Sequence, residues 1–249
     1  NNLMVHDDLV TVIINCHNGE KYIRETIESV LNQTYDEFEL LLVDNCSTDN
    51  TRDIFSSYND KRLIYFKTSN KVSLGSARNI GLELSNGKYI NFIDSDDIWE
   101  SNKLEFQLHM IKGKNYSATY TQSINMYEDG RRILSSKRRS DEIISLEKIS
   151  KYYDICLSSL MINFTNNKIK NYKFNENLEA LEDADYVLKL LSESPMIYIN
   201  KPLTIYRIHS ENISNTRQDL FYKDIKLMKE EYKREGKYFL LQNCDYFYD

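Results

Sequence analysis

Residues 89–99, YINFIDSDDIW, are the most informative segment of the chain, because a strand signal there ends in a cluster of acids. Residues 89–93 are mostly β-branched or aromatic, which favours a buried strand. Asp94, Asp96 and Asp97 follow at once. Several negative charges at the end of a buried strand are electrostatically costly unless a ligand or an ion offsets them. The stretch therefore predicts a strand that brings a charged site to the edge of a sheet.

Strand and helix signals alternate along the first half of the chain. Continuous apolar runs predict four buried strands, and stretches with a 3.6-residue apolar period predict the helices between them. The strands are expected at 9–14, 38–44, 62–67 and 88–94, and the helices at 18–33, 47–58, 73–87 and 101–112, with Asn18 and either Ser47 or Thr48 as N-caps of the first two. This alternation predicts an α/β fold with right-handed crossovers and a mainly parallel central sheet.

The second half of the chain is less regular. Its signals are a hairpin with a tight turn, a helix with acids in its first turn, short strands before a polar loop, and an amphipathic helix. These elements are expected at 117–136, with Asp129 and Gly130 in the turn, and at 179–194, 196–214 and 218–239. A boundary between two halves is expected near residue 115.

Charge and cysteine usage exclude several classes of function. The 32 Lys and Arg against 38 Asp and Glu give a net charge of −6 without a strongly basic domain, which argues against nucleic-acid binding. The basic segment KRRS at 137–140, with Arg131 and Arg132 upstream, is interpreted as a solvated loop face rather than a lipid or phosphate site. The four scattered Cys predict neither a zinc site nor a disulfide framework and suit a reducing cytosol. We recognise no signal peptide and no apolar run near the ~20 residues that span a bilayer.

Polar residues follow three of the predicted strands. Open parallel sheets bind ligands outside the carboxyl ends of their strands, so these residues are expected to share one crevice. They are Asn15, Cys16, His17 and Asn18 after the first strand, Asp44 and Asn45 after the second, and residues 94–97 after the fourth.

Asp94 and Asp96 are two residues apart and would point the same way in an extended segment, with Ser95 facing away. Two converging carboxylates repel each other unless a proton or a cation lies between them. Oxygen ligands of this kind suit Mg²⁺ or Mn²⁺, and such an ion would neutralise a departing diphosphate. The alternative is a simple turn, since Asp clusters are common where strands end.

Several motifs, taken together and in order, resemble family 2 glycosyltransferases of GT-A fold. The segments VTVIINCHNGEKYIRETIESVLNQTYDEFELLLVDNCSTDNT and GSARNIGLELSNGKYINFIDSDDIWESNKLE are similar to the first half of that family. LEDADYVLKL and YRIHSENIS are similar to its later E-D and Y-R-x-H-x-x-N-x-S segments. The resemblance is dense over 9–111 and thinner over 178–214. It implies an αβα sandwich with an acceptor-side subregion and a C-terminal helix, and inverting transfer of a sugar from a nucleotide donor.

The resemblance also implies roles for parts of the chain and for single residues. Residues 1–115 would bind the nucleotide-sugar, 116–215 would bind the acceptor and carry the base, and 216–249 would form a helical tail. The divalent ion would be held by Asp94 and Asp96, with His209 as a third ligand or a phosphate contact. The general base would be Asp183, and the nucleotide side would include Asn15, His17, Asp44, Asn45, Arg78, Ser95 and Glu182.

Three of these residues have simpler interpretations. Glu182 and Asp183 could be acids that merely stabilise the first turn of a helix. Arg78 could pair with a neighbour on its own helix instead of contacting phosphates.

Two departures from the family pattern bear on the donor. Asn15, Cys16 and His17 replace the usual Pro-Thr-Tyr, and Asn45 replaces an Asp that accepts a hydrogen bond from uracil N3–H. Asn also accepts through its carbonyl oxygen, but with less charge assistance. A UDP-sugar is therefore the expected donor, and another pyrimidine nucleotide is the alternative.

The sequence thus predicts a glycosyltransferase that uses Mn²⁺ or Mg²⁺ and a nucleotide-sugar to extend a surface glycan, such as capsule or lipopolysaccharide. Its expected partners are the donor and a glycan or lipid-linked acceptor, in the cytoplasm or on the inner face of the membrane, with its oligomeric state left open. The alternative is a non-catalytic nucleotide- or carbohydrate-binding module of the same fold, in which Asn45 and the altered NCH segment have lost turnover. A sugar-nucleotide pyrophosphorylase is disfavoured because IINCHNGEKY lacks a Gly-rich loop with Arg and Lys.

Overall fold

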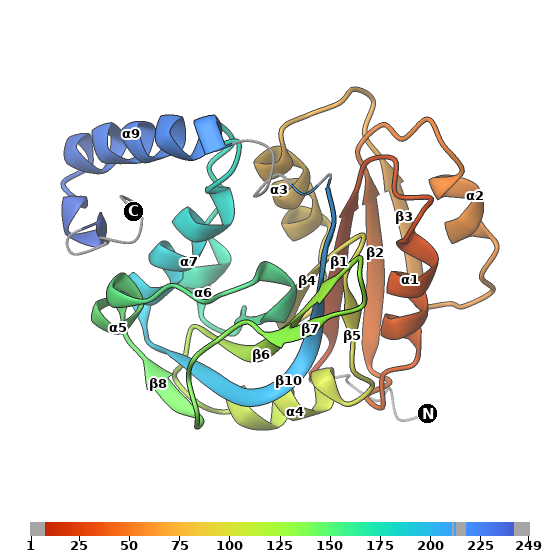
Figure 1. Ribbon diagram of the computed structural model, residues 1–249, viewed down its shortest axis with the longest axis horizontal. Helices are drawn as coiled ribbons and strands as arrows, with labels where there is room; N and C mark the ends of the chain where they lie inside the picture. The colour runs from red at the N-terminus through yellow and green to blue at the C-terminus, as the bar shows by residue number, and fades with distance from the viewer. Residues whose placement is uncertain (1–7, 211, 213–217, 242–249) are drawn as a thin grey trace.

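The computed structural model describes residues 8–210, 212 and 218–241. It contains a ten-stranded sheet with helices on both faces (Figure 1). The strand order is β3-β2-β1-β4-β9-β6-β10-β5, with β7 beside β6 and β8 beside β10. The sheet continues across residue 115, because β4 of the first half pairs with β9 of the second.

The first half has the alternating strands and helices that the sequence predicts. β1 pairs in parallel with β2 and β4, and β2 pairs in parallel with β3, so four strands end at one edge of the sheet. The bounds are β1 Val10–Cys16, α1 Ile23–Leu31, β2 Phe38–Asp44, α2 Thr51–Ser56, β3 Leu63–Lys67, α3 Leu74–Leu84, β4 Tyr89–Asp94, β5 Ile98–Trp99 and α4 Lys103–Ile111. The α/β class is confirmed, and beyond β4 the sheet becomes mixed.

Alternation along β1 divides the core between the two faces of the sheet. Ile13 packs on one face in a cluster with Ala77 of α3, and Val12 packs on the other with Ile27 of α1. The absence of a side chain on Gly81 allows α3 to approach β1, since a Cβ there would lie 2.6 Å from Cγ2 of Ile13. Burial of both faces produces the expected αβα sandwich.

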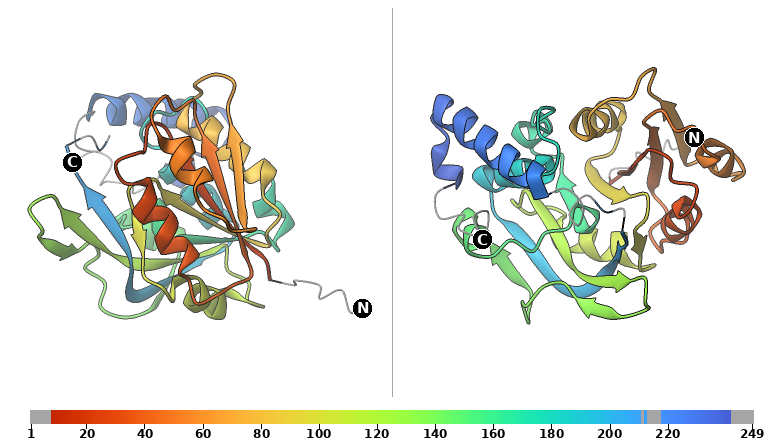
Figure 2. Two further views of the ribbon diagram at one scale, coloured as in Figure 1. Left: turned by 90° about the vertical axis from the view of Figure 1, so that its right-hand side faces the viewer. Right: turned by 45° about the horizontal axis from the view of Figure 1, so that its top comes forward.

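The second half supplies the rest of the sheet and four further helices of the described chain. Its elements are β6 Ala118–Tyr127, β7 Arg132–Leu134, β8 Glu142–Ile144, α5 Leu146–Lys151, η1 Leu157–Ser159, β9 Leu160–Asn163, α6 Asn167–Lys170, α7 Glu182–Glu193, β10 Met196–Ile208, α9 Gln218–Arg234 and η2 Tyr238–Leu241. The predicted hairpin is confirmed: β6 and β7 are antiparallel, and Gly130 in the turn has a φ of +85°. Helix α9 lies beside α7 (Figure 2).

The prediction of short strands over 196–208 is wrong. One 13-residue strand, β10, runs through this segment and pairs with β6 in parallel. The pairing register shifts on both sides of Pro202, which has no N–H to donate to a ladder. The strand therefore crosses a bulge where the sequence suggests a break.

The predicted caps of the first two helices are also wrong. α1 begins at Ile23, and Asn18 lies in the preceding loop with a φ of +56°. The Asn18 Oδ1 accepts the N–H of Thr48 at 2.8 Å, so both residues join two loops instead of capping helices. α2 begins later than expected, after Asn50.

No helix in the described ranges is both long and apolar enough to cross a membrane.

Candidate active site

The acids after β4 lie in a tight turn. Asp94 ends the strand, and the N–H of Asp97 donates to the Asp94 carbonyl at 3.1 Å. Residues 94–96 therefore do not form an extended segment, and the prediction that strand alternation points Asp94 and Asp96 the same way is wrong. The two carboxylates still interact: the pKa of Asp94 is raised to about 6, mainly by burial and further by the charges of Asp96 and Asp183, against the opposing charge of Arg78.

Ser95 is packed under the loop that follows β1. Its carbonyl accepts the Thr26 hydroxyl at 3.0 Å, and its own hydroxyl lies within hydrogen-bonding reach of Cys16. Burial raises the pKa of the Cys16 thiol to about 11, so this thiol remains protonated. The contact links the β4 turn to the end of β1.

Asp97 joins the turn to the second half of the chain. Its fully buried carboxylate accepts the Ser158 hydroxyl through Oδ2 and the N–H of Arg207 at 3.0 Å through Oδ1. Ser158 also accepts the N–H of Asp94 at 3.0 Å. Burial, followed by the charges of Asp94 and Asp96, holds the pKa of Asp97 well above its usual value. Sequence reasoning gave Asp97 and Ser158 no role, because their partners are distant along the chain.

Arg207 binds the same turn from the end of β10. Its Nε donates to the Asp96 carbonyl at 2.9 Å, and its guanidinium bonds Glu25 of α1 at 2.9 Å. The guanidinium also lies 4.4 Å from the ring centre of Tyr22. Arg207 belongs to the YRIH motif, which was the available signal, but no pattern in the sequence distinguishes it from the other arginines.

Arg78 of α3 lies at the centre of an acid cluster. It is 4% exposed and donates to Glu182, the first residue of α7, while its other nitrogen lies 3.6 Å from Asp94. The pairing crosses between helices, so the simpler interpretation of a neighbour on α3 does not hold. Burial raises the pKa of Glu182 to about 7 despite this guanidinium, and Glu182 Oε2 is buried without a hydrogen-bond partner.

Asp183 lies next to this pair, in the first turn of α7. Its Oδ1 accepts the N–H of Ala184 at 2.7 Å. Burial raises the pKa of Asp183, while the Arg78 charge and the backbone N–H lower it. Arg78, Asp94, Glu182 and Asp183 therefore lie together, and they come from three elements.

His209 lies beside Asp96. Its Nε2 is 2.8 Å from Asp96 Oδ2, and its ring is 5.4 Å from that of Tyr22 between centroids. Asn212 accepts the N–H of His209 at 2.6 Å, which fixes the backbone after β10. His209 is only 8% exposed. The structure therefore brings together the predicted pair of a carboxylate and an imidazole.

The side chains of Asp96 and His209 fit the chemistry of a divalent cation without enclosing one. In the part of the chain that the structure describes, no group of three or more His, Cys, Asp or Glu forms a metal cage. One carboxylate and one imidazole, with the Asp94 carboxylate close by, are donors that Mn²⁺ accepts, and Mg²⁺ accepts the carboxylates. A cation at such an open site would complete its shell with water and phosphate oxygens.

The polar side chains at the end of β2 are bonded within the chain. Asp44 is fully buried, and its carboxylate accepts the N–H of Ser47 at 2.7 Å and the Tyr65 hydroxyl at 2.5 Å. Asn45 binds Val72 at both ends of its amide: Nδ2 donates to the carbonyl and Oδ1 accepts the N–H, each at 2.9 Å. Only an amide can make both bonds, which explains why Asn suits this position.

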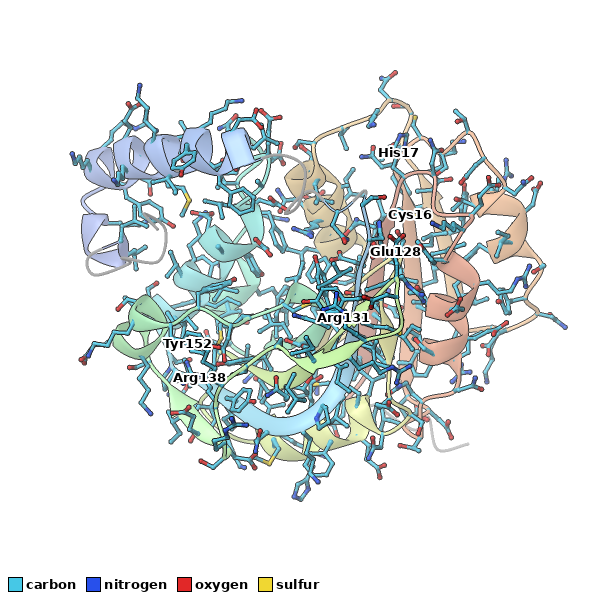
Figure 3. All side chains as sticks on the ribbon, in the orientation of Figure 1. Cys16, His17, Glu128, Arg131, Arg138 and Tyr152 are labelled. Atoms are coloured by element: carbon cyan, nitrogen blue, oxygen red, sulfur yellow. The ribbon has the colours of Figure 1, made fainter. Side chains whose placement is uncertain are left out.

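His17 and Asn15 lie at the end of β1, and Figure 3 shows His17 with Cys16 at this edge. His17 is exposed, and its Nδ1 is 2.8 Å from the Asn45 carbonyl. If Nδ1 donates that bond, the other ring nitrogen is available to a ligand. Asn15 pairs in register with Asp94, and neither its Oδ1 nor its Nδ2 has a hydrogen-bond partner although both are buried. Unpaired buried amides are costly and often mark a ligand or water site.

Comparisons with known proteins identify the class of enzyme that this fold and site define. The family model for glycosyl transferase family 2 matches residues 11–175. The chain is 31% identical over 210 residues to the Escherichia coli UDP-Glc:alpha-D-GlcNAc-diphosphoundecaprenol beta-1,3-glucosyltransferase WfaP, covering 83% of this chain and 80% of that protein. It is 32% identical over 216 residues to the putative teichuronic acid biosynthesis glycosyltransferase TuaG of Bacillus subtilis, covering 84% and 82%.

Among solved structures, the fold is similar to S. aureus TarS. The TarS structure in complex with UDP-GlcNAc matches with a TM-score of 0.72 at 22% identity, over 86% of this chain and 63% of that one. This chain therefore spans less than two thirds of that structure. At this identity the likeness shows the fold alone. From the family match and the two relatives, the chain belongs to glycosyltransferase family 2 and is a glycosyltransferase, with the GT-A fold that its motifs predict.

Proposed function

We propose that this glycosyltransferase moves a sugar from a UDP-sugar to a hydroxyl group of a growing surface glycan. The observation that carries the proposal is the acid cluster around Arg78, which gathers Asp94, Glu182 and Asp183 beside the carboxyl ends of parallel strands. Support for the donor and acceptor comes from WfaP, named for UDP-Glc and a diphosphoundecaprenol-linked sugar, and from TuaG, named for teichuronic acid. TarS has been solved with UDP and with UDP-GlcNAc.

In the proposed reaction, Asp183 is the general base. The acceptor hydroxyl attacks the anomeric carbon while the diphosphate leaves on the opposite side, and Asp183 takes the hydroxyl proton as the new bond forms. The raised pKa of Asp183, caused mainly by burial, makes it a stronger base than an exposed aspartate. Glu182 orients Arg78, whose positive charge favours a negative group in the crevice.

The proposed cation, Mn²⁺ or Mg²⁺, would be held by Asp96 and His209 with Asp94 alongside. When bound, it would neutralise negative charge on the departing diphosphate. Asp97 and Arg207 would serve it indirectly, because they fix the backbone of the turn that carries Asp96.

For the nucleotide, Asn15 is the strongest candidate for direct contact, because its buried amide has no hydrogen-bond partner. His17 is the second, because its ring is exposed beside the Asn45 carbonyl. Asp44, Asn45 and Ser95 are proposed to act through the loops that they hold.

The test is transfer from a panel of UDP-sugars to undecaprenyl-diphosphate-linked sugars, in the presence of Mn²⁺. We expect donor consumption by the natural chain and none by Asp96→Ala. The matched control is Asp53→Ala, an exposed aspartate on α2, which should retain activity. A chain that binds UDP tightly but consumes none of the donors would instead be the non-catalytic module, and an active Asp96→Ala would refute the role of the cation site.

We further propose that the enzyme works in the cytoplasm, on the inner face of the membrane, and contacts lipid through the β7 surface. This surface consists of the exposed residues Arg131, Arg132, Ile133, Leu134, Lys137 and Arg139. Residues 131–139 contain five Lys or Arg and no acid, and Ile133 and Leu134 are each 49% exposed. Apolar side chains flanked by cations complement a bilayer that carries anionic head groups.

The position of this surface suits a lipid-linked acceptor. Met126 of β6 lies opposite both Arg132 of β7 and Arg207 of β10, so two strand spacings, about 10 Å, separate the two arginines. Arg207 binds the turn that carries Asp96. In Figure 3 the side chains of Arg131 and Arg138 mark the course of this segment across the front of the molecule. The sequence interpretation of a solvated loop did not consider the two exposed apolar residues.

Sedimentation with vesicles tests the lipid contact. We expect binding to vesicles rich in phosphatidylglycerol, little binding to phosphatidylcholine, and loss of binding in Ile133→Asn/Leu134→Asn. The matched control is Tyr222→Asn, a 68% exposed side chain on α9, which should bind as the natural chain does. Loss of binding in Tyr222→Asn alone would move the lipid contact to the C-terminal helix.

A further inference from the structure

One carboxylate of α9 binds the backbone that leads into the candidate base. Asp224 is fully buried. Its Oδ2 accepts the N–H groups of Glu179, Ala180 and Leu181, at 2.9, 2.7 and 3.0 Å. Three successive N–H groups directed at one oxygen form an anion-binding concavity, and a charged acceptor fills it more strongly than a neutral one.

This binding site lies immediately before α7. Leu181 is the N-cap of α7 and makes no side-chain capping bond. Glu182 and Asp183 are the next two residues. Asp224 therefore binds the N–H of the N-cap residue and those of the two residues before it, and it does so from another helix. Because Asp183 is the second residue after Leu181, a shift of this backbone moves the Asp183 carboxylate with it.

Helix α9 makes other bonds to the region around α7, among them an ion pair of Lys223 with Glu179 and two bonds farther from residues 179–181. The Tyr232 hydroxyl donates to Asp185, and Asn175 donates to Glu231 at 2.6 Å. Neither bond involves the backbone of residues 179–181. Loss of either bond would therefore weaken the docking of α9 without acting directly on the backbone that leads to Asp183.

We propose that Asp224 is a positioning residue that sets the location of Asp183 relative to the acceptor hydroxyl. The inference rests on the proposed function, in which Asp183 takes the proton. The sequence predicts that the C-terminal helix is a tail. In this proposal, α9 instead holds the backbone that leads to Asp183. Displacement of a catalytic group by about 1 Å can lower a rate by about a hundredfold.

The principal test is Asp224→Asn, which keeps the size of the side chain and removes its charge. We expect kcat for glycosyl transfer to fall about 10- to 100-fold. The KM for the donor and the Kd for UDP should stay within about twofold, because Asn15 and His17, the residues proposed to contact the nucleotide, lie at the end of β1 and not on α7. Because a smaller folded fraction would also lower the apparent kcat at constant KM, kcat is calculated per UDP-binding site titrated in each variant.

Two variants of α9 serve as matched controls. Tyr232→Phe removes the bond to Asp185 and should lower the thermal midpoint while leaving kcat intact. Glu230→Gln changes an exposed acid on the same helix and should alter neither. If Tyr232→Phe lowers kcat as much as Asp224→Asn does, the effect belongs to helix docking and the inference is overturned.

Asp224→Glu provides a second variant that keeps the charge and lengthens the arm, in case Asp224→Asn does not fold. An intermediate kcat with unchanged donor KM supports the inference, and natural kcat in either folded variant overturns it. Failure of the proposed function looks different: the natural chain would then transfer no sugar. Suppose that the natural chain is active and Asp183→Asn is not. An unchanged kcat in Asp224→Asn would then refute the positioning role of Asp224 and leave the proposed function standing.

Discussion

The ends of β2 and β4 lie at the same edge of the sheet but differ in how their polar groups are satisfied. At β2, every side-chain oxygen and nitrogen of Asp44 and Asn45 bonds another group of the chain. Around β4, the pKa of Asp94 is raised to about 6, Glu182 keeps an unpartnered buried oxygen, and the Asn15 amide has no partner.

This difference in hydrogen bonding distinguishes residues that support the loops from residues that could bind a ligand. Fully bonded polar groups stabilise a loop and gain little from a ligand, whereas crowded carboxylates and unpaired amides gain when a cation or a polar ligand arrives. β1 pairs in parallel with both β2 and β4, so strand pairing does not explain the difference between the ends of β2 and β4. We therefore propose that residues on the β4 side contact the ligand directly and that residues on the β2 side support the loops.

The largest expected effect comes from the β4 side. Asp183→Asn should lower kcat for transfer by about 10²–10⁴-fold, because general-base catalysis contributes on that order. Binding of UDP, measured by calorimetry, should stay close to that of the natural chain. Full transfer by Asp183→Asn would reduce this residue to a stabilising acid in the first turn of α7.

An effect on stability is expected at β2. Asn45→Asp replaces the amide that donates to the Val72 carbonyl with an oxygen that repels it. We expect a loss of about 1–3 kcal/mol in the free energy of unfolding, measured in urea. The control is Asn177→Asp, an exposed position that should change little. If Asn45→Asp were as stable as the natural chain and bound UDP more tightly, Asn45 would contact the base directly, as the family pattern implies.

The smallest expected effect is that of Tyr65→Phe. It removes one hydroxyl bond to the Asp44 carboxylate and should cost about 1–2 kcal/mol of unfolding free energy. Transfer kinetics should remain unchanged, because the bond lies under the β2 loop. A tenfold rise in donor KM for Tyr65→Phe would show that the β2 end takes part in ligand binding, and the comparison would fail.

The parallel strands and their helices could be predicted because each has a strong local signal. The bulge of β10 at Pro202 could not, since its ladder partner is β6, some 80 positions earlier in the chain. Prediction of the candidate site is limited in the same way, because contacts between residues far apart in the sequence leave no local signal. Asp94, Asp96, Asp183 and His209 lie in recognisable motifs, but the roles of Ser158 and Asp224 depend on backbone groups far away in sequence.

The interaction of Asp94 with Asp96 has a different structural cause from the one that the sequence predicts. The sequence places Asp94 and Asp96 together through strand alternation, whereas a turn brings them together. Asp97, the third acid of the opening stretch, anchors that turn through Ser158 and Arg207. A short stretch therefore identifies the candidate site, and only tertiary contacts distinguish the acids that we propose as cation ligands from Asp97, which holds the turn.

The raised pKa values on the β4 side determine the direction in which stability changes with pH. The pKa values of about 6 for Asp94 and about 7 for Glu182 lie above those of the unfolded chain, so the folded state binds more protons between about pH 4 and pH 7. Their contribution to stability is full below the unfolded pKa values and is lost as the pH rises through 6 to 7. A bound cation should favour the charged forms and release those protons.

The sharpest test of a cation-dependent site is the release of protons that accompanies binding of UDP-glucose with Mn²⁺. It is measured by calorimetry in buffers of different ionisation enthalpy, and the diphosphate of this donor has no ionisation near neutral pH. We predict that protons are released at pH 6, that almost none are released at pH 8, and that the natural chain binds the donor only weakly without Mn²⁺. Equal release at both pH values, or binding that is indifferent to Mn²⁺ in the natural chain, would contradict a cation-dependent site among the acids of β4.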